Sequence, residues 1–97
     1  MNKHEQGRAM WLRALVHLTL KGEGRPPTFR ELAKFCGYNP GGASRAIYGL
    51  ERRGLVRTTP GESRSARITD KGIRFLADAE LPPFTESDAR IRELIGI

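Results

Sequence analysis

Apolar side chains recur along the chain mainly at helical spacing, which predicts a domain built chiefly from helices. A first helix is predicted over residues 8–21, and Gly22 follows it as a stop. Apolar positions occupy more than half of its circumference, which is more than one small core can easily cover. They divide into two stripes on a helical wheel. The core stripe is Trp11, Ala14, Leu15 and Leu18, and the second stripe, in need of another partner, is Leu12, Val16 and Leu20.

Two short helices are predicted next. Thr28 and Glu31 have the spacing of a capping box, and the helix that they open ends at Gly37. Asn39 is the predicted N-cap of a further helix that runs to about Arg53. Two short helices joined by a tight, glycine-containing turn are typical of a helix-turn-helix. The inward positions of the first of these helices are predicted to be Leu32, Ala33, Phe35 and Cys36.

A β-hairpin and a fourth helix follow. Residues 55–59 and 66–68 are β-prone, and a Pro-Gly turn dipeptide lies between them. The pattern predicts a hairpin whose loop lies near residues 60–65. Thr69 then caps a helix over residues 70–80. Its predicted inward positions are Ile73, Leu76 and Ala77.

The order of these elements divides the chain into three parts. Residues 1–7 lack periodicity and are expected to be disordered, whereas residues 8–80 form one domain. Residues 81–97 hold a Pro-Pro hinge and a short helix with an apolar face, made of Ile91, Leu94 and Ile95. The predicted fold is mainly α with a small β-hairpin (α+β). A three-helix core carries the hairpin, the fourth helix and the short C-terminal helix.

Composition restricts the class of protein. With 97 residues, 38% hydrophobic and 29% charged, the chain has the size and composition of one soluble globular domain. Its longest mostly apolar run, residues 14–20, is far shorter than the roughly 20 residues that span a bilayer, and no secretory signal precedes it. A single cysteine excludes an internal disulfide framework and a multi-thiolate metal site. We therefore expect a cytoplasmic protein with no membrane partner.

The charge is unevenly distributed. Residues 1–79 hold 15 Lys and Arg against 7 Asp and Glu, a balance of +8, whereas residues 80–97 hold 2 against 4, a balance of −2. A basic body with a mildly acidic tail suits a domain that binds a polyanion such as nucleic acid. The alternative is a basic surface that is merely solvated.

The helix over residues 39–53 carries the most specific pattern. At about 100° per residue, its apolar positions gather on one side. The opposite side holds Gly41, Arg45, Tyr48 and Arg52. Such a face suits a helix in a DNA major groove, where Arg binds guanine in a bidentate way. Gly41 and Gly42 lack side chains and let the helix N-terminus approach a phosphate.

The hairpin and the start of the second helix add further cations. Residues 57–67, here called the wing, carry Arg57, Arg64 and Arg67 against a single acid. A basic arm of this kind can contact backbone phosphates or enter a narrow minor groove. Thr28 and Arg30 are further candidate phosphate contacts, although capping is the main role predicted for Thr28.

Several segments resemble the DNA-binding domain of LexA-type repressors over roughly residues 8–68. They are Pro26-Pro27-Thr28, Arg30-Glu31-Leu32-Ala33, Gly37, Asn39-Pro40, Leu50-Glu51-Arg52-Arg53-Gly54-Leu55-Val56 and the wing segment Gly61–Ile68. The following Ile68–Gly72 is similar to the end of the wing in MarR-type regulators. The resemblance implies a winged helix-turn-helix whose third helix reads bases while the wing contacts the DNA backbone. It also places Ser44 and Arg45 where such helices meet base edges.

Two features depart from that family. The self-cleaving peptidase domain is expected to be absent, because the chain ends less than 20 residues after the fourth predicted helix. Gly41 and Gly42 replace the side chains that usually stand there, so the recognised sequence need not be an SOS operator. The resemblance therefore implies the architecture of the domain, and it does not identify the genes that the protein regulates.

No catalytic or metal-binding pattern is found. His4 and His17 are predicted to be surface residues without a nearby triad or ligand set. Cys36 ends an apolar stripe and is interpreted as a small buried hydrophobe. We expect no enzyme activity, no cofactor and no metal.

A homodimer is the predicted assembly, because two-fold pairing lets two recognition helices read half-sites about 10 base pairs apart. Its surface is predicted to combine Leu12, Val16 and Leu20 with Ile91, Leu94 and Ile95. The alternative is that the tail folds back on its own first helix.

Taken together, the patterns predict a sequence-specific double-stranded DNA-binding transcriptional regulator, most simply a repressor. Its helix over residues 39–53 would read the major groove. Two alternatives stay open. One is a winged-helix protein-interaction module, and the other is a replication or partition DNA-binding protein of a phage or plasmid.

Overall fold

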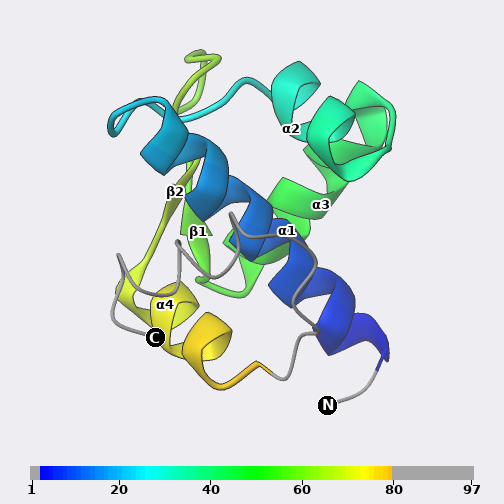
Figure 1. Ribbon diagram of the computed structural model, residues 1–97, viewed down its shortest axis with the longest axis vertical. Coiled ribbons are helices and arrows are strands. Elements are labelled where there is room, and N and C mark those ends of the chain that lie inside the picture. Colours follow the sequence, from blue (N-terminus) through cyan, green and yellow to red (C-terminus); the bar gives the residue numbers. More distant parts are fainter. Residues whose placement is uncertain (1–2, 80–97) are drawn as a thin grey trace.

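A computed structural model describes residues 3–79 of the chain and shows several helices packed together, with a small β-hairpin on one flank (Figure 1). The elements are α1 (Lys3–Lys21), α2 (Phe29–Cys36), α3 (Pro40–Arg52), β1 (Val56–Arg57), β2 (Arg67–Ile68) and α4 (Asp70–Ala77). The predicted class, mainly α with a small β-hairpin, is confirmed. The short C-terminal helix predicted within residues 81–97 lies outside the described residues, together with Ile91, Leu94 and Ile95.

Helix α1 runs through the middle of the domain and contacts α2, α3, α4 and β2. It begins at Lys3, so residues 3–7, which were expected to be disordered, form its N-terminal end. All of residues 12–17 are buried. The division into a core stripe and a spare stripe is therefore wrong. Leu12 and Val16 are 0% and 7% exposed and belong to the one core, while Leu20 remains 38% exposed.

Two further predictions of exposure are wrong. The first concerns His17 on α1, a helix that is covered on more sides than its sequence indicates. His17 is buried, and its ring lies against that of Phe35 at a centroid distance of 4.9 Å. Phe35, predicted to face inward, is 40% exposed because it stands at the edge of the contact between α1 and α2. Cys36 is half-buried against the core, as its interpretation as a small hydrophobe requires.

The caps of α2 and α3 form as the sequence predicts. Thr28 Oγ1 accepts a hydrogen bond from Glu31 N at 3.1 Å, and Glu31 Oε1 accepts one from Thr28 N at 3.0 Å, which completes the capping box. Gly37 ends α2 with a φ of 75°, in the left-handed region that favours glycine. Asn39 Oδ1 accepts from Gly42 N at 2.7 Å and begins α3. These two caps fix the tight turn of the helix-turn-helix.

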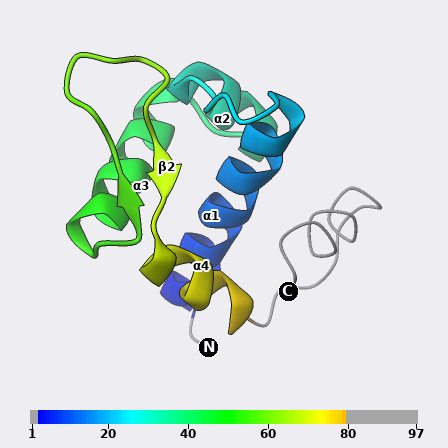
Figure 2. The same ribbon diagram turned by 90° about the vertical axis from the view of Figure 1, so that its left-hand side faces the viewer.

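The wing is a hairpin with only two paired residues in each strand, fewer than predicted. Val56 pairs with Ile68 and Arg57 with Arg67 in antiparallel register. Beyond these pairs, side chains replace the ladder: Thr58 N and Oγ1 both donate to Glu51 Oε2, at 2.9 and 2.7 Å. Figure 2 shows α3 and the hairpin together on one side of the molecule, with α1 on the other.

Helix α4 closes the domain against α1 and β2. Thr69 caps it, and Thr69 Oγ1 also donates to Gly54 O at 2.6 Å. Its buried residues are Gly72 and Leu76, whereas Ile73 and Ala77, predicted to face inward, are exposed. A side chain at Gly72 would collide with the carbonyl oxygen of Leu55, so the Gly72 side of the helix lies directly against this backbone. Within residues 3–79, no helix is long and apolar enough to cross a membrane.

The resulting arrangement is a winged helix-turn-helix. Its core lies between α1, the helix-turn-helix and the hairpin. The largest fully buried side chains of this core are Leu12, Leu15, Leu32, Ile47, Leu50 and Val56.

Candidate nucleic-acid interface

Helix α3 turns one face to the core and the opposite face to solvent, as the helical wheel predicts. Ala43, Ile47 and Leu50 are its buried residues. Arg45, Tyr48 and Arg52 are exposed on the other side. The Tyr48 ring is 54% exposed and meets the edge of Phe29 in a T-shaped contact, with a centroid distance of 6.3 Å. The exposed ring of Tyr48 thus shares one face of α3 with the exposed side chains of Arg45 and Arg52.

The N-terminal end of α3 presents backbone with little side chain over it. Gly41 is exposed, and a Cβ built there would meet only Asn39 Oδ1, at 3.4 Å. Gly42 donates its N–H to that same oxygen, so the Asn39 side chain is occupied as a cap. Ser44, half-buried, follows within the first turns. A phosphate could therefore approach the helix start closely, where the helix dipole favours an anion.

The wing presents two cations side by side. Arg57 and Arg67 are directly opposite each other in the antiparallel register, and both are exposed. Residues that face each other across an antiparallel pair project to the same side of the hairpin. Arg67 Nη1 also reaches Gly24 O at 3.4 Å, at the outer limit of a hydrogen bond. The two guanidinium groups thus give the wing a concentrated positive charge.

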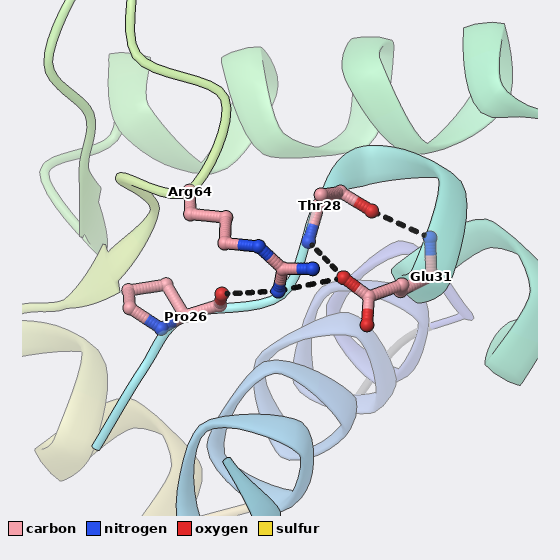
Figure 3. Close-up of polar contacts among 4 residues, drawn as sticks. All are labelled: Pro26, Thr28, Glu31 and Arg64. Atoms are coloured by element: carbon pink, nitrogen blue, oxygen red, sulfur yellow. Dashed lines mark hydrogen bonds and ion pairs between the residues drawn. The ribbon is translucent and has the colours of Figure 1, made fainter. Parts of the chain in front are cut away.

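Arg64, the third wing cation, lies against the body of the domain (Figure 3). Its Nη1 is 2.7 Å from Glu31 Oε1 and donates to Pro26 O at 3.2 Å. Hydrogen bonds from Thr28, first from its backbone and then from its side chain, together with the charge of Arg64, lower the pKa of Glu31. The carboxylate that holds Arg64 is therefore ionised at neutral pH.

The remaining two predicted contacts lie at the start of α2. Arg30 is exposed there, whereas Thr28 is half-buried and carries both bonds of the capping box. The Phe29 contact with Tyr48 places this helix start beside the exposed face of α3. The structure thus brings α2, α3 and the wing to neighbouring positions.

Sequence reasoning missed a basic groove on the other flank of α3. The groove, with a volume of about 250 Å³, lies between the N-terminal half of α1 and α3. Its charged lining is Arg8, Arg45 and Arg53, with His4 at one end. Arg45 joins the groove to the exposed face of α3. This groove depends on tertiary packing. No sequence pattern near Arg8 or Arg53 shows that α1 and α3 bring these residues together.

An apolar hollow of about 490 Å³ lies between α1 and the end of α2, and it shares Gly7 and Trp11 with the basic groove. Its larger lining residues are Met10, Trp11, Phe35, Cys36 and Tyr38. The rings of Trp11 and Tyr38 meet at a tilt of 52° with a centroid distance of 5.1 Å. Burial raises the pKa of the Cys36 thiol, which favours its protonated form at neutral pH. Among the described residues, no group of three or more His, Cys, Asp or Glu could hold a metal ion.

LexA repressors are similar to this chain. The LexA repressor of Ralstonia nicotianae is 37% identical over 59 residues, which are 60% of this chain and 27% of the repressor. That of Methylococcus capsulatus is 37% identical over 68 residues, 69% of this chain and 30% of the repressor. That of Bordetella petrii is 34% identical over 76 residues, 77% of this chain and 31% of the repressor. The chain thus spans roughly 30% of the length of these relatives.

The model of the MarR family matches residues 8–65. Together with the LexA relatives, this match confirms the resemblance to both LexA-type and MarR-type regulators. This match covers more than half of the chain and includes most of α1, both helices of the helix-turn-helix, β1 and most of the wing. The chain belongs to the MarR family.

Proposed function

We propose that this protein is a sequence-specific double-stranded DNA-binding transcriptional regulator that acts as a repressor. The exposed face of α3 carries the proposal: Arg45, Tyr48 and Arg52 point outward from a helix that the core holds firmly by its other side. The acid of this helix, Glu51, is turned to the wing, where Thr58 donates to it twice. A face with donors and an aromatic ring matches the major-groove edges of bases.

The side chains divide by role. On α3, Arg45 reads a base edge, with Ser44 beside it, while Tyr48 and Arg52 contact bases or the adjoining phosphates. The phosphate contacts on one flank come from the wing, through Arg57 and Arg67, and from the helix starts. These helix-start contacts are Thr28 and Arg30 at α2, and Asn39, Gly41 and Gly42 at α3.

The basic groove supplies the phosphate contacts of the other flank. Glu51 faces the wing from one side of α3, and Arg53 lines the groove from nearly the opposite side. A helix in a major groove has a phosphate backbone on each side. Arg8 and Arg53 are therefore placed to meet the strand that the wing does not reach.

Repression is the simplest mode of regulation for such a domain, because occupying a promoter is sufficient. The relatives named above are repressors by name, which supports the same mode here. We place this activity in the cytoplasm, and the proposal includes no enzymatic step.

A homodimer is part of the proposal, with a surface different from the predicted one. Leu12 cannot contribute, since it is fully buried within a single chain, whereas Val16, 7% exposed, lies at the bottom of the groove described next. Leu20 and Ile73 are exposed beside an apolar groove of about 480 Å³ between α1, β2 and α4, which offers a surface for a second copy. Light scattering of the full chain at about tens of micromolar decides this point, and a monomer there would contradict it.

Selection of bound duplexes from a random DNA pool tests the proposed function. We expect an enriched motif whose preference over random DNA persists as salt rises, because base contacts depend less on salt than phosphate contacts do. The absence of any motif, with binding that vanishes at moderate salt, would contradict sequence-specific recognition. In that case the apolar hollow around Trp11 and Phe35 would favour a protein-interaction module instead.

A further inference from the structure

The wing loop, residues 58–66, is fastened to the helix-turn-helix by one ion pair. Arg64 Nη1 lies 2.7 Å from Glu31 Oε1 and donates to Pro26 O at 3.2 Å (Figure 3). The two side chains are 33% and 49% exposed, so the contact is partly shielded from water. It joins the wing loop to the start of α2 across a long stretch of sequence.

The Glu31 side chain is held by its own helix start, independently of Arg64. The same oxygen that faces Arg64 accepts from Thr28 N at 3.0 Å, and Glu31 N donates to Thr28 Oγ1 at 3.1 Å. A carboxylate fixed by its own helix start loses little conformational freedom when it forms an ion pair. Glu31 is therefore an anchor of fixed position.

The wing loop needs such an anchor because its strands are short. Each strand pairs through only two residues, and the loop closes on itself through Ser65, which accepts from Thr59 N at 3.0 Å and donates to Glu62 O. At its base the wing is bound to α3 through Thr58 and Glu51. On the returning side of the hairpin, Ala66 is buried in the core and Arg67 reaches Gly24 O. Arg64 adds a point of attachment nearer the tip, where the loop has no other bond to the helices among the described residues.

A direct grip of Arg64 on DNA conflicts with this geometry. A phosphate at the Arg64 guanidinium would stand close to the Glu31 carboxylate, and two like charges at that distance repel. Within residues 3–79, neither Arg57 nor Arg67 forms an ion pair with a carboxylate.

We propose that Arg64 is a positioning residue, whose ion pair with Glu31 holds the wing against α2 and so sets where Arg57 and Arg67 meet DNA. This rests on the proposed DNA-binding function. It reassigns Arg64 from the phosphate contact that the sequence predicts to an indirect role, and it assigns Glu31 a role in DNA binding despite its negative charge.

The test uses the full chain with Arg64→Gln, Glu31→Gln and the double variant. Glutamine at position 31 can still complete a capping box, so Glu31→Gln removes the charge and keeps the cap. Arg57→Gln serves as the matched variant for a phosphate contact. The first measurement is amide hydrogen exchange of Thr59 and Glu62 without DNA, because both amides are bonded within the wing loop. The second is the dissociation constant on the selected duplex at several salt concentrations.

The proposal predicts that Arg64→Gln and Glu31→Gln each speed exchange at these amides by about fivefold, the upper range for an exposed ion pair. Each also weakens DNA binding by about the same factor, and the double variant is no worse than either single variant. The salt dependence of binding stays that of the wild type. The slope of log K against log salt is negative. In contrast to the other variants, Arg57→Gln makes this slope shallower by about 0.9.

Unchanged exchange in both single variants would overturn the proposal. A second result would also overturn it: a shallower salt dependence in Arg64→Gln together with tighter DNA binding by Glu31→Gln. These two results would mean that Arg64 binds a phosphate. If the wild type binds no duplex, the proposed function fails, and with it the part of the proposal that concerns DNA. The exchange rates would still decide whether the ion pair holds the wing loop.

Discussion

Arg57 and Arg67 face each other across the antiparallel register of the wing, with both side chains exposed. Like charges directly opposite on a hairpin cost about 0.2–1 kcal/mol relative to neutral pairs. Contact of both guanidinium groups with DNA phosphates would explain why the chain keeps this unfavourable pair. Arg57→Gln should raise the free energy of unfolding by that amount at low salt while weakening binding to all duplexes alike. Chemical denaturation and DNA titration check the two effects, and a variant that is less stable yet binds normally would contradict this interpretation.

Two helical glycines of opposite surroundings test the packing of α4. A Cβ at Gly72 would collide with Leu55 O and lie 2.7 Å from Ile68 Cγ1, whereas at Gly7 nothing lies within 4 Å. Gly72→Ala should therefore destabilise the protein by about 1–3 kcal/mol through overpacking. Gly7→Ala should stabilise it by up to about 1 kcal/mol through helix propensity. Thermal unfolding of both variants decides the matter, and equal midpoints would show that α4 does not lie close to Leu55 and β2.

Leucines of α1 separate core from surface. Leu12 is 0% exposed and Leu20 is 38% exposed. Leu12→Ala should lower the free energy of unfolding by about 2–5 kcal/mol because it leaves a cavity in the core. Leu20→Ala should change it far less. If Leu12→Ala instead left stability unchanged and altered only the oligomeric state, Leu12 would be part of a dimer surface after all.

The low pKa of Glu31 predicts how the ion pair responds to acid. Bonds from Thr28 and the charge of Arg64 lower this pKa in the folded protein below the ordinary value of 4.5. The stabilisation is then fully present above the unfolded-state pKa and is lost as pH falls through the folded-state pKa. The difference in unfolding midpoint between wild type and Glu31→Gln should stay constant from neutral pH down to about 4.5 and shrink below it. A difference that already vanishes near neutral pH would show that the carboxylate is not held in this way.

The features that the sequence predicts correctly are local ones. The caps at Thr28, Asn39 and Thr69 depend on bonds to backbone groups three residues along the chain, and all three form. The exposed face of α3 likewise follows from the helical period alone, because this helix packs against the core on one side and faces solvent on the other. Its burial pattern repeats the predicted wheel.

The features that the sequence misses depend on tertiary packing. The burial of His17 and Val16 follows from the number of elements around α1, which no periodicity within the helix reveals. The pairing of Arg64 with Glu31 and the groove shared by Arg8 and Arg53 join residues far apart in the chain. A basic residue in a loop is equally compatible with a free cation and with a paired one, so only the fold distinguishes them.

Recognition of bases by the exposed face of α3 is tested most directly by Arg45→Ala. This variant and the wild type should be titrated with the selected duplex and with single-base changes of it. Loss of a bidentate contact to guanine should cost about 1–3 kcal/mol on the preferred site and relax discrimination at one base position, with other positions unaffected. Binding of Arg45→Ala that matches the wild type in both strength and preference would contradict the proposed orientation of α3 on DNA.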